Sequence, residues 1–453
     1  MKYTEFSGKN GRDEFKRELI AEKVINLLTS DVNISPMMID GNWGSGKTEF
    51  CLKLINKFKT EYSDYRLLYI DAFQADHADN PLMTILSSVI NLEPEEEKKK
   101  ELIEKAIPVI RYGVKAVAKA AVSHVLKINT EELNDEFEKI AEDAADKAID
   151  ASVKNLLKEH ENAKKDLEAL QKILEELAEK APIIIFIDEL DRCRPDFAVQ
   201  MIETIKHTFD ITDVKFVLVT NSQQLTAAIH HRYGEQVDAR RYLDKFIKFS
   251  FSLSEYVAGN NYNNENRELA STSYFYKLII SSSVLQNSFI QNPQEGAYNF
   301  AKNLVSVNKL SLRETETFVR YLEICHGLND NLKNNILFGY QLLYILGIFL
   351  FSYKPDIAKE ISANKFDLNR IMLLLGWENK PDFNNERYNF SIIDIVGVAL
   401  AQHKKELLNI SEENLTTFNE RWHSYFRHGW GAPDNPFVPI REIIWSLQLD
   451  NIR

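Results

Sequence analysis

The residues of this sequence best suited to chemistry form a glycine-rich run, GNWGSGKT, at Gly41–Thr48. The run fits GxxxxGK[ST] at every fixed position and lies between a short apolar segment and a segment with helical spacing. Glycines let backbone N–H groups curl around a phosphate, and the N-terminus of the following helix adds a favourable dipole. In this pattern Lys47 reaches the β- and γ-phosphates, and the Thr48 hydroxyl can ligate Mg²⁺. We therefore expect ATP with Mg²⁺ to bind here. The predicted nucleotide-binding residues are Asn42, Trp43, Gly44, Ser45, Gly46, Lys47, Thr48 and Glu49.

Two acids, Asp188 and Glu189, directly follow the apolar run Ile183–Ile187. Ligands of α/β sheets bind at the carboxyl ends of the strands, so acids placed there can face a phosphate loop on a neighbouring strand. We expect Asp188 to hold Mg²⁺ together with Thr48, and Glu189 to act as the general base that polarises the attacking water. Alone, such a pair could equally cap the next helix, but beside an intact phosphate loop the catalytic interpretation is favoured.

Several other polar residues are candidates for catalysis with Lys47. Asn221 follows the apolar segment Lys215–Thr220, where a sensor of the γ-phosphate would lie, although a turn-forming asparagine is an equal alternative. Arg192 could form a local ion pair with Asp191 or reach the nucleotide of a neighbouring subunit, where an arginine stabilises the transferring phosphoryl group. Further candidates are Arg240 and Arg241 as arginine fingers and Arg313 as a second sensor.

The elements that must position these residues alternate along the chain. Short apolar runs predict strands, and apolar residues three and four apart predict helices. The predicted strands are Pro36–Asp40, Arg66–Asp71, Ile183–Ile187 and Lys215–Thr220. The predicted helices near them are Asp13–Leu28, Glu49–Phe58 and Pro81–Ile90. This order predicts an α/β fold, a parallel-sheet P-loop NTPase with a long helical insertion and an all-helical C-terminal region.

The composition changes along the chain and suggests four parts. Residues 1–92 and 181–260 would form the two halves of the NTPase domain, and 261–453 a helical C-terminal domain. Residues 93–180 are rich in Glu, Lys and Ala, and apolar positions from Ile149 to Leu177 alternate steps of four and three. Such steps are typical of a helix that buries a narrow seam against another helix, as in a coiled coil.

Two motifs together resemble the KAP family of P-loop NTPases. They are GNWGSGKTEF and the stretch Ile183–Pro195, IIIFIDELDRCRP, in which the LDRC element after the acids is the most specific part. The likeness extends over roughly the first 325 residues. Further matching segments are Ile70–Phe73, Glu203–Phe209, Phe216–Thr220, Tyr242–Phe246 and Leu310–Arg313.

The resemblance implies an ATPase of the ASCE division, in which the P-loop and Walker B strands flank the sensor strand. Family members tend to carry an acid near the position of Asn221, so this chain departs from the pattern there. Many members place transmembrane helices in the insertion, where this chain has a charged helical segment. Bacterial relatives are often associated with defence against phages and plasmids, and such a role is implied here.

Charge and hydropathy restrict the partners that we expect. The formal net charge of -12 disfavours nucleic acid as the main partner, and the three cysteines lack metal or disulfide spacing. The apolar run Ile336–Phe351 is shorter than the ~20 residues that a membrane helix needs, so we expect a core helix and no transmembrane segment. A basic face over Ile107–Leu126 could lie on a membrane or be a solvated surface. With no apolar leader at the N-terminus, we expect a cytoplasmic protein.

The leading hypothesis is a Mg²⁺-dependent ATPase that couples ATP binding and hydrolysis to conformational change or assembly, with a protein partner or as a homo-oligomer. The alternative is a nucleotide-gated scaffold that binds ATP with negligible hydrolysis and recruits a partner effector. A positioned base at Glu189 favours the enzyme, because a pure binding protein has no need of one. A nucleic-acid motor or clamp is a third hypothesis, which the acidic balance weakens.

Overall fold

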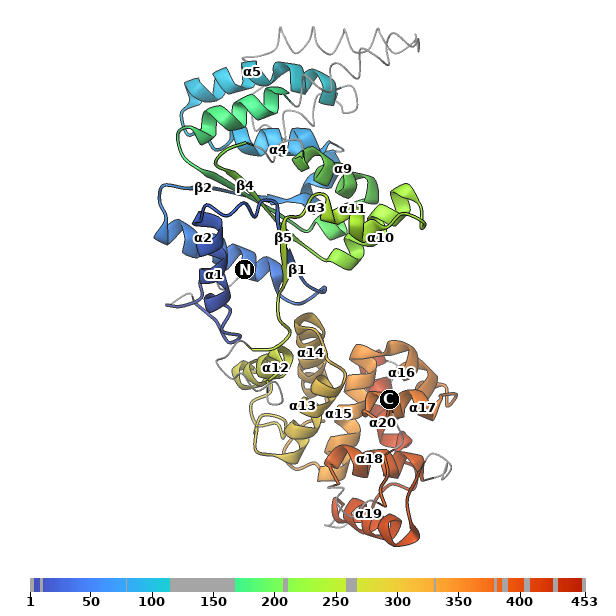
Figure 1. Ribbon diagram of the computed structural model, residues 1–453. Coiled ribbons are helices and arrows are strands. Elements are labelled where there is room, and N and C mark those ends of the chain that lie inside the picture. Colours follow the sequence, from blue (N-terminus) through green and yellow to red (C-terminus); the bar gives the residue numbers. More distant parts are fainter. Residues whose placement is uncertain are drawn as a thin grey trace. The chain divides into compact units, whose positions relative to one another are not determined.

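The computed structural model describes most of the chain, which divides into two compact units, Met1–Ser254 and Glu255–Arg453 (Figure 1). The finer division into four parts stays a prediction. The described residues are 4–8, 11–78, 80–114, 168–206, 211–257, 267–329, 331–378, 381–384, 390–402, 408–426 and 431–449.

Among the described residues, the first unit forms one five-stranded parallel sheet in the order β2-β3-β4-β1-β5. The four predicted strands are confirmed, and the order places β4 between β3 and β1, as the family resemblance implies. The edge strand β5 was not predicted, because its four residues, FSFS, are mostly exposed and show no apolar run. Short edge strands of this kind limit pairing with other chains. The strands are β1 (Met37–Asp40), β2 (Arg66–Asp71), β3 (Ile183–Asp188), β4 (Val214–Thr220) and β5 (Phe249–Ser252).

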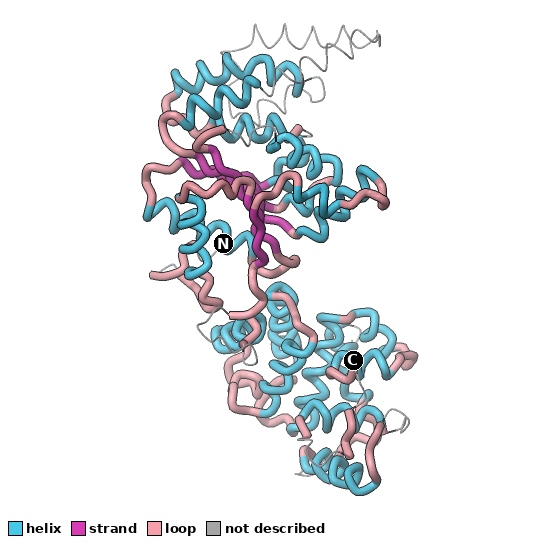
Figure 2. Tube along the Cα trace, in the orientation of Figure 1, coloured by secondary structure: helices cyan, strands magenta, loops and turns pink. Residues whose placement is uncertain are grey.

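Helices cover both faces of this sheet and make a three-layer α/β/α unit (Figure 2). Successive residues of a strand point to opposite faces, so Ile184 and Phe186 of β3 pack with α1 (Glu18–Thr29) and α2 (Lys47–Glu61). The alternate residues of β3 pack with α4 (Pro81–Ile90), α9 (Pro195–Lys206) and α10 (Ser222–Tyr233). All six residues of β3 are buried, as is typical of a parallel strand covered on both sides. The other helices of this unit are α3 (Ala72–Ala75), η1 (Asp76–Ala78), α5 (Glu96–Val114), η2 (Leu190–Arg192) and α11 (Ala239–Asp244).

The register brings the carboxyl ends of the central strands to one edge. Asp71 of β2 pairs with Asp188 of β3, and Asp40 of β1 pairs with Thr220 of β4. The loop at Gly41–Gly46 therefore leaves the sheet at the same edge as the two acids at the end of β3, with β4 between the two strands. The convergence of phosphate loop and acids that the sequence predicts is a direct result of this register.

Asp40 also connects β1 to the segments on either side of it. Its carboxylate accepts hydrogen bonds from Ser222 N (2.8 Å) and Ser252 Oγ (3.2 Å), and its carbonyl accepts from Leu253 N (2.8 Å). Ser254 O accepts a hydrogen bond from Arg17 Nη2 (3.4 Å). The last residues of the first unit are thus held against the strand that leads into the phosphate loop.

The described ends of the predicted insertion pack onto the same core as the sheet. Residues 168–178 are helical, and Leu170, Leu174 and Leu177 are buried in that core beside Leu102 of α5. An ion pair joins Lys105 to Glu176 (2.6 Å). The predicted seam from residue 149 to 167 and the predicted basic face beyond residue 114 lie outside the described residues.

The second unit is helical over its described elements, as predicted for the C-terminal region. The apolar run at Ile336–Phe351 becomes α15, which packs at the centre of this unit. Its Gly347 allows close approach of α20, since a Cβ there would come within 3.1 Å of Ile440 O. Within the described ranges, we find no helix whose length and apolarity suffice to cross a bilayer. The helices are α12 (Ala270–Ser281), α13 (Gly296–Val307), α14 (Leu312–Asn329), α15 (Phe338–Tyr353), α16 (Pro355–Ser362), α17 (Leu368–Leu374), α18 (Ile392–Ala401), α19 (Glu412–Ser424) and α20 (Phe437–Gln448).

Candidate functional site

The loop between β1 and α2 is wrapped around its own lysine. Lys47 Nζ donates hydrogen bonds to the carbonyl oxygens of Gly41 (2.6 Å) and Asn42 (3.3 Å). Gly44 and Gly46 have φ angles of 77° and 82°, in the left-handed region that glycine adopts without strain. The loop geometry therefore requires glycine at these two positions, and the backbone closes around the lysine head group.

The interior of this loop is suited to an anion. Lys47 is only 8% exposed, and burial lowers its pKa, an effect opposed by Asp191 first and then by Asp188. The Ser45 hydroxyl is buried without a hydrogen-bond partner among the described residues. A Cβ on Gly41 would come within 2.9 Å of that hydroxyl. A buried cation beside an unsatisfied hydroxyl fits a phosphate group, which would accept from both.

Asp188 is a nearly fully buried carboxylate at the end of β3. It is 1% exposed and accepts hydrogen bonds from Tyr69 Oη (3.1 Å) and Glu189 N (2.8 Å). Burial raises its pKa to about 6, although its hydrogen bonds, the first of them with Thr48, act in the opposite direction. A buried acid whose charge is only partly compensated fits a site for a divalent cation.

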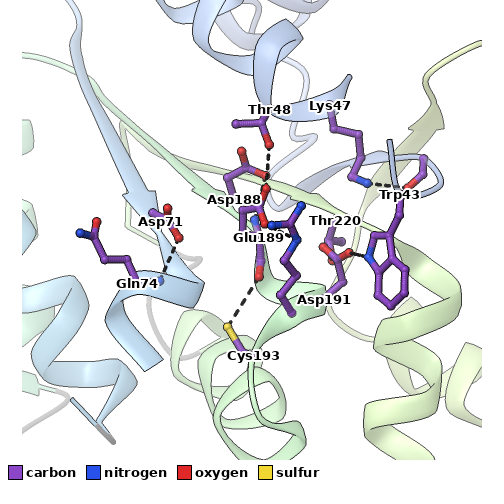
Figure 3. Close-up of polar contacts among 12 residues, drawn as sticks. Trp43, Lys47, Thr48, Asp71, Gln74, Asp188, Glu189, Asp191, Cys193 and Thr220 are labelled. Carbon is purple, nitrogen blue, oxygen red and sulfur yellow. Dashed lines mark hydrogen bonds and ion pairs between the residues drawn. The ribbon is translucent and has the colours of Figure 1, made fainter. Parts of the chain in front are cut away.

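Glu189 lies beside Asp188 and contacts two of the other predicted site residues (Figure 3). Its Oε1 accepts a hydrogen bond from Thr48 Oγ1 (3.0 Å), and its Oε2 forms an ion pair with Arg192 Nε (2.5 Å). Its φ of 62° lies in the left-handed region, which is unusual for a residue with a side chain. The structure thus brings Thr48, Asp188, Glu189 and Arg192 together at one sheet edge.

Two predicted site residues have side chains engaged in helix structure. The side-chain oxygen of Asn221 caps α10 by accepting from Gln223 N (3.0 Å) and Gln224 N (3.4 Å). This capping role is structural and differs from the turn-forming role considered from the sequence, so a sensor contact would fall to the amide nitrogen. Glu49 forms an ion pair with Lys53 (2.7 Å), one turn along α2. For Glu49 the backbone N–H is therefore the group suited to a phosphate.

The remaining arginine candidates stay predictions. Arg240 and Arg241 are exposed on α11, and Arg241 Nε pairs with Asp238 Oδ2 (3.2 Å). Arg313 lies on α14, in the second unit. By contrast, Arg192 forms its ion pair with a residue of the site itself, Glu189.

Tyr69 and Thr220 were not identified from the sequence as site residues, and Asp191 was named only as a possible partner of Arg192, which pairs with Glu189 instead. Tyr69 donates to Asp188, and Asp191 accepts from Trp43 Nε1 (2.5 Å) and Thr220 Oγ1 (3.2 Å). The position of Asp191 in the LDRC element was the available signal for its importance. Tyr69 and Thr220 lie within apolar strands, where nothing in the local pattern marks them as site residues.

The donor set is compatible with Mg²⁺. Among the described residues, no three His, Cys, Asp or Glu side chains gather as metal ligands. Mg²⁺ usually keeps several waters and takes one or two protein ligands together with substrate phosphates. Thr48 and Asp188 would hold it here, with the remaining ligands coming from the nucleotide and from water.

Comparison with known proteins identifies the family. Residues 17–328, well over half of the 453-residue chain, match the KAP family P-loop domain. No curated protein matches the chain. Among solved structures it is similar to the ORC2 protein of Aeropyrum pernix in ADPNP–ADP complexes, with 13% identity and a TM-score of 0.36 over 95% of this chain and 93% of that one. That likeness is too weak to carry an argument. The family match is sufficient by itself, and the chain belongs to the KAP family of P-loop NTPases.

Proposed function

We propose that this protein is a Mg²⁺-dependent ATPase that couples ATP binding and hydrolysis to conformational change or assembly. The observation that carries the proposal is the convergence of a lysine-filled glycine loop with Thr48, Asp188 and Glu189. Thr48 belongs to α2 and the acids follow β3, so one hydrogen bond of 3.0 Å joins residues 141 positions apart. A phosphate loop opposite two acids is the arrangement that phosphoryl transfer requires.

The residues of the chain would change partners when ATP binds. Lys47 would exchange the carbonyl oxygens of Gly41 and Asn42 for phosphate oxygens, which are stronger acceptors because they are charged. Bound Mg²⁺ would supply positive charge to the β- and γ-phosphates. Thr48 would turn from Glu189 toward that ion. Glu189 Oε1 would then be able to accept a proton from a water.

The backbone at Glu189 supports a functional role for this residue. A side chain in the left-handed region costs about 1 kcal/mol relative to the right-handed one. Such strain persists where the surrounding structure fixes it, and it concentrates at active sites. At Glu189 it allows Asp188 to point into the sheet edge while the next carboxylate meets Thr48.

One observation favours the alternative of a nucleotide-gated scaffold. Both carboxylate oxygens of Glu189 are engaged, Oε1 by Thr48 and Oε2 by Arg192. If Arg192 stayed paired with Glu189 after ATP bound, the carboxylate would be unable to accept a proton from water. ATP would then be bound without turnover. A protein partner or homo-oligomerisation, and a role in defence against phages or plasmids, are supported by the family resemblance alone.

The test separates binding from turnover in the wild-type protein. ATP affinity is measured by calorimetry, and phosphate release is measured with Mg²⁺ and with EDTA, each alone and with DNA, RNA or candidate protein partners. The ATPase hypothesis predicts binding and Mg²⁺-dependent release. The scaffold hypothesis predicts binding with no release under any of these conditions. Failure to bind ATP would overturn both.

A further inference from the structure

A chain of two hydrogen bonds crosses the candidate site at Asp191. Its Oδ2 accepts from the indole N–H of Trp43 (2.5 Å), and its Oδ1 accepts from the hydroxyl of Thr220 (3.2 Å) (Figure 3). Trp43 is in the phosphate loop, Asp191 is in η2 after β3, and Thr220 ends β4. The carboxylate therefore joins three segments that lie at the same edge of the sheet.

Trp43 is held by this hydrogen bond together with partial burial. Its side chain is 49% exposed, so apolar packing holds only part of the ring. The next residue, Gly44, is in a left-handed conformation, which gives the loop backbone alternatives that other residues lack. On the other side, Asn42 O accepts from both Lys47 Nζ and Ser45 N. The indole N–H thus links the loop to η2, which follows a different strand.

The second donor to Asp191, Thr220, lies in the core of the first unit. Thr220 is fully buried, and β4 lies between β3 and β1 in the sheet. Leu190, next to Asp191, is also fully buried, so η2 is held in place by packing. Asp191 therefore presents a fixed acceptor to the exposed part of the loop, at Asn42 and Trp43. Only a carboxylate supplies acceptors on both oxygens, because an asparagine in this place would turn an amide nitrogen toward one of the two donors.

We infer that Asp191 is a positioning residue, which holds the phosphate loop through Trp43 in the form that admits the triphosphate. The inference rests on the proposed nucleotide site and deepens it by naming a residue outside the P-loop, the metal ligands and the base. Nucleotide affinity then depends on the bond between the indole and the carboxylate, although Asp191 itself needs no contact with the ligand. The same contact would couple loading of the loop to the end of β4.

The experiment is a double-mutant cycle on the affinity for ADP and for a non-hydrolysable ATP analogue, both measured by calorimetry. Trp43→Phe keeps the ring and removes the donor, and Asp191→Asn removes one acceptor. We expect each to weaken binding about 5- to 20-fold, as for the loss of one charge-assisted hydrogen bond at a partly exposed site. The double variant should bind about as weakly as the weaker single variant, because both remove the same bond.

Thr220 and Asp196 supply the matched comparisons. Thr220→Val should weaken nucleotide binding, and Thr220→Ser, which keeps the hydroxyl, should restore it. Asp196→Asn removes an acid from the neighbouring α9, where Asp196 lies at the surface, and should leave affinity unchanged. Thermal melting of the nucleotide-free variants checks the fold. A merely structural role would lower the melting temperature without coupling in the affinities.

Three results would overturn the inference: unchanged affinity in both single variants, losses that multiply in the double variant, or tighter binding by Asp191→Asn. The last would mean that the carboxylate repels the phosphates instead of positioning the loop. If the wild-type protein binds no nucleotide, the proposed function fails. If the wild type binds and all variants bind equally, only the role of Asp191 fails.

Discussion

The phosphate loop and the acidic loop, residues 188–192 from the end of β3 through η2, face each other but are held in different ways. The phosphate loop is fixed largely by its own residues, since Lys47 bonds to carbonyls five and six positions away. The acidic loop is fixed by side chains from distant elements, at sequence separations of 119, 141 and 29 residues. Those side chains are Tyr69 of β2 on Asp188, Thr48 of α2 on Glu189, and Thr220 of β4 on Asp191.

This difference suggests that the two loops have different roles. A loop held mainly by its own lysine, with one long-range link from Trp43 to Asp191, changes little when most other elements move, which suits a binding site for phosphate. A loop held by several other elements responds when any of them moves, which suits a switch. Substitutions in the first should therefore change binding. Substitutions in the second, except at Asp191, which contacts the phosphate loop through Trp43, should change turnover or stability while binding persists.

The largest effect is expected in the phosphate loop, for the variant Lys47→Ala. This variant loses at least two charge-assisted contacts to the phosphates, each worth about 1.5–3 kcal/mol, so ATP affinity should fall about 1,000-fold or more. Calorimetric titration measures the loss. Lys59→Ala, which removes an exposed lysine from the same helix, serves as the control. Near-normal ATP affinity of Lys47→Ala would mean that the phosphate loop is not the ATP-binding site.

Glu189→Gln tests the acidic loop, the second region of the comparison. The amide keeps the size of the side chain but cannot accept a proton, so phosphate release should fall on the order of 100-fold or more. ATP affinity should stay within about threefold, because Glu189 makes no predicted contact with the ground-state phosphates. Release assays and titrations are run in parallel, with Glu235→Gln at an exposed position as the control. Turnover at the wild-type rate would place the base elsewhere.

Asp188 gives the acidic loop a dependence on pH. Because burial raises its pKa from 3.8 to about 6, the native state holds this proton more tightly than the unfolded state. Its contribution to stability is therefore favourable at low pH and is lost as pH rises through about 6. This rise in the pKa of Asp188 corresponds to roughly 3 kcal/mol of unfolding free energy at most.

We therefore expect Asp188→Asn, without nucleotide or metal, to be more stable than the wild type at pH 7.5 by about 1–3 kcal/mol. The difference should vanish near pH 4. Denaturant unfolding at the two pH values measures it, and Asp196→Asn, at the surface, should show no such trend. A difference that grows toward pH 4 would mean that Asp188 is stabilised, not penalised, as a carboxylate.

Arg192→Gln should have the smallest effect. The guanidinium is about a third exposed, so its ion pair with Glu189 contributes about 1 kcal/mol or less. Releasing the base from this pair should raise basal phosphate release about two- to fivefold, while ATP affinity is unchanged. Arg241→Gln, at an exposed ion pair on α11, is the control. A loss of turnover of 100-fold or more would instead make Arg192 an arginine finger.

The difference between local and long-range contacts also explains which parts of the site could be predicted from the sequence. The phosphate loop, its strand and its helix are specified within 25 consecutive residues, so the pattern alone predicted them. The two acids were predicted because they end a strand whose apolar run is unmistakable. The contacts of Trp43 with Asp191 and of Tyr69 with Asp188 are determined by sheet register, which no local pattern encodes.

Elements that lack a strong pattern were the ones missed or altered. In β5 two exposed serines alternate with two phenylalanines, and at a sheet edge nothing requires more apolar residues. The first helix begins at Glu18 and not at Asp13, because the Asp13 carboxylate accepts from the backbone N–H groups of Arg17 and Glu18. Asn221 and Glu49 have their side chains engaged in local helix contacts that compete with the roles predicted for them.

Asp40 has a mechanical consequence for the chain as a whole. It is the residue before the phosphate loop, and it holds Ser252 and Leu253 through side-chain and backbone bonds. The second unit begins two residues later, at Glu255. A shift of the loop on nucleotide binding would therefore reach the last residues of the first unit directly through Asp40.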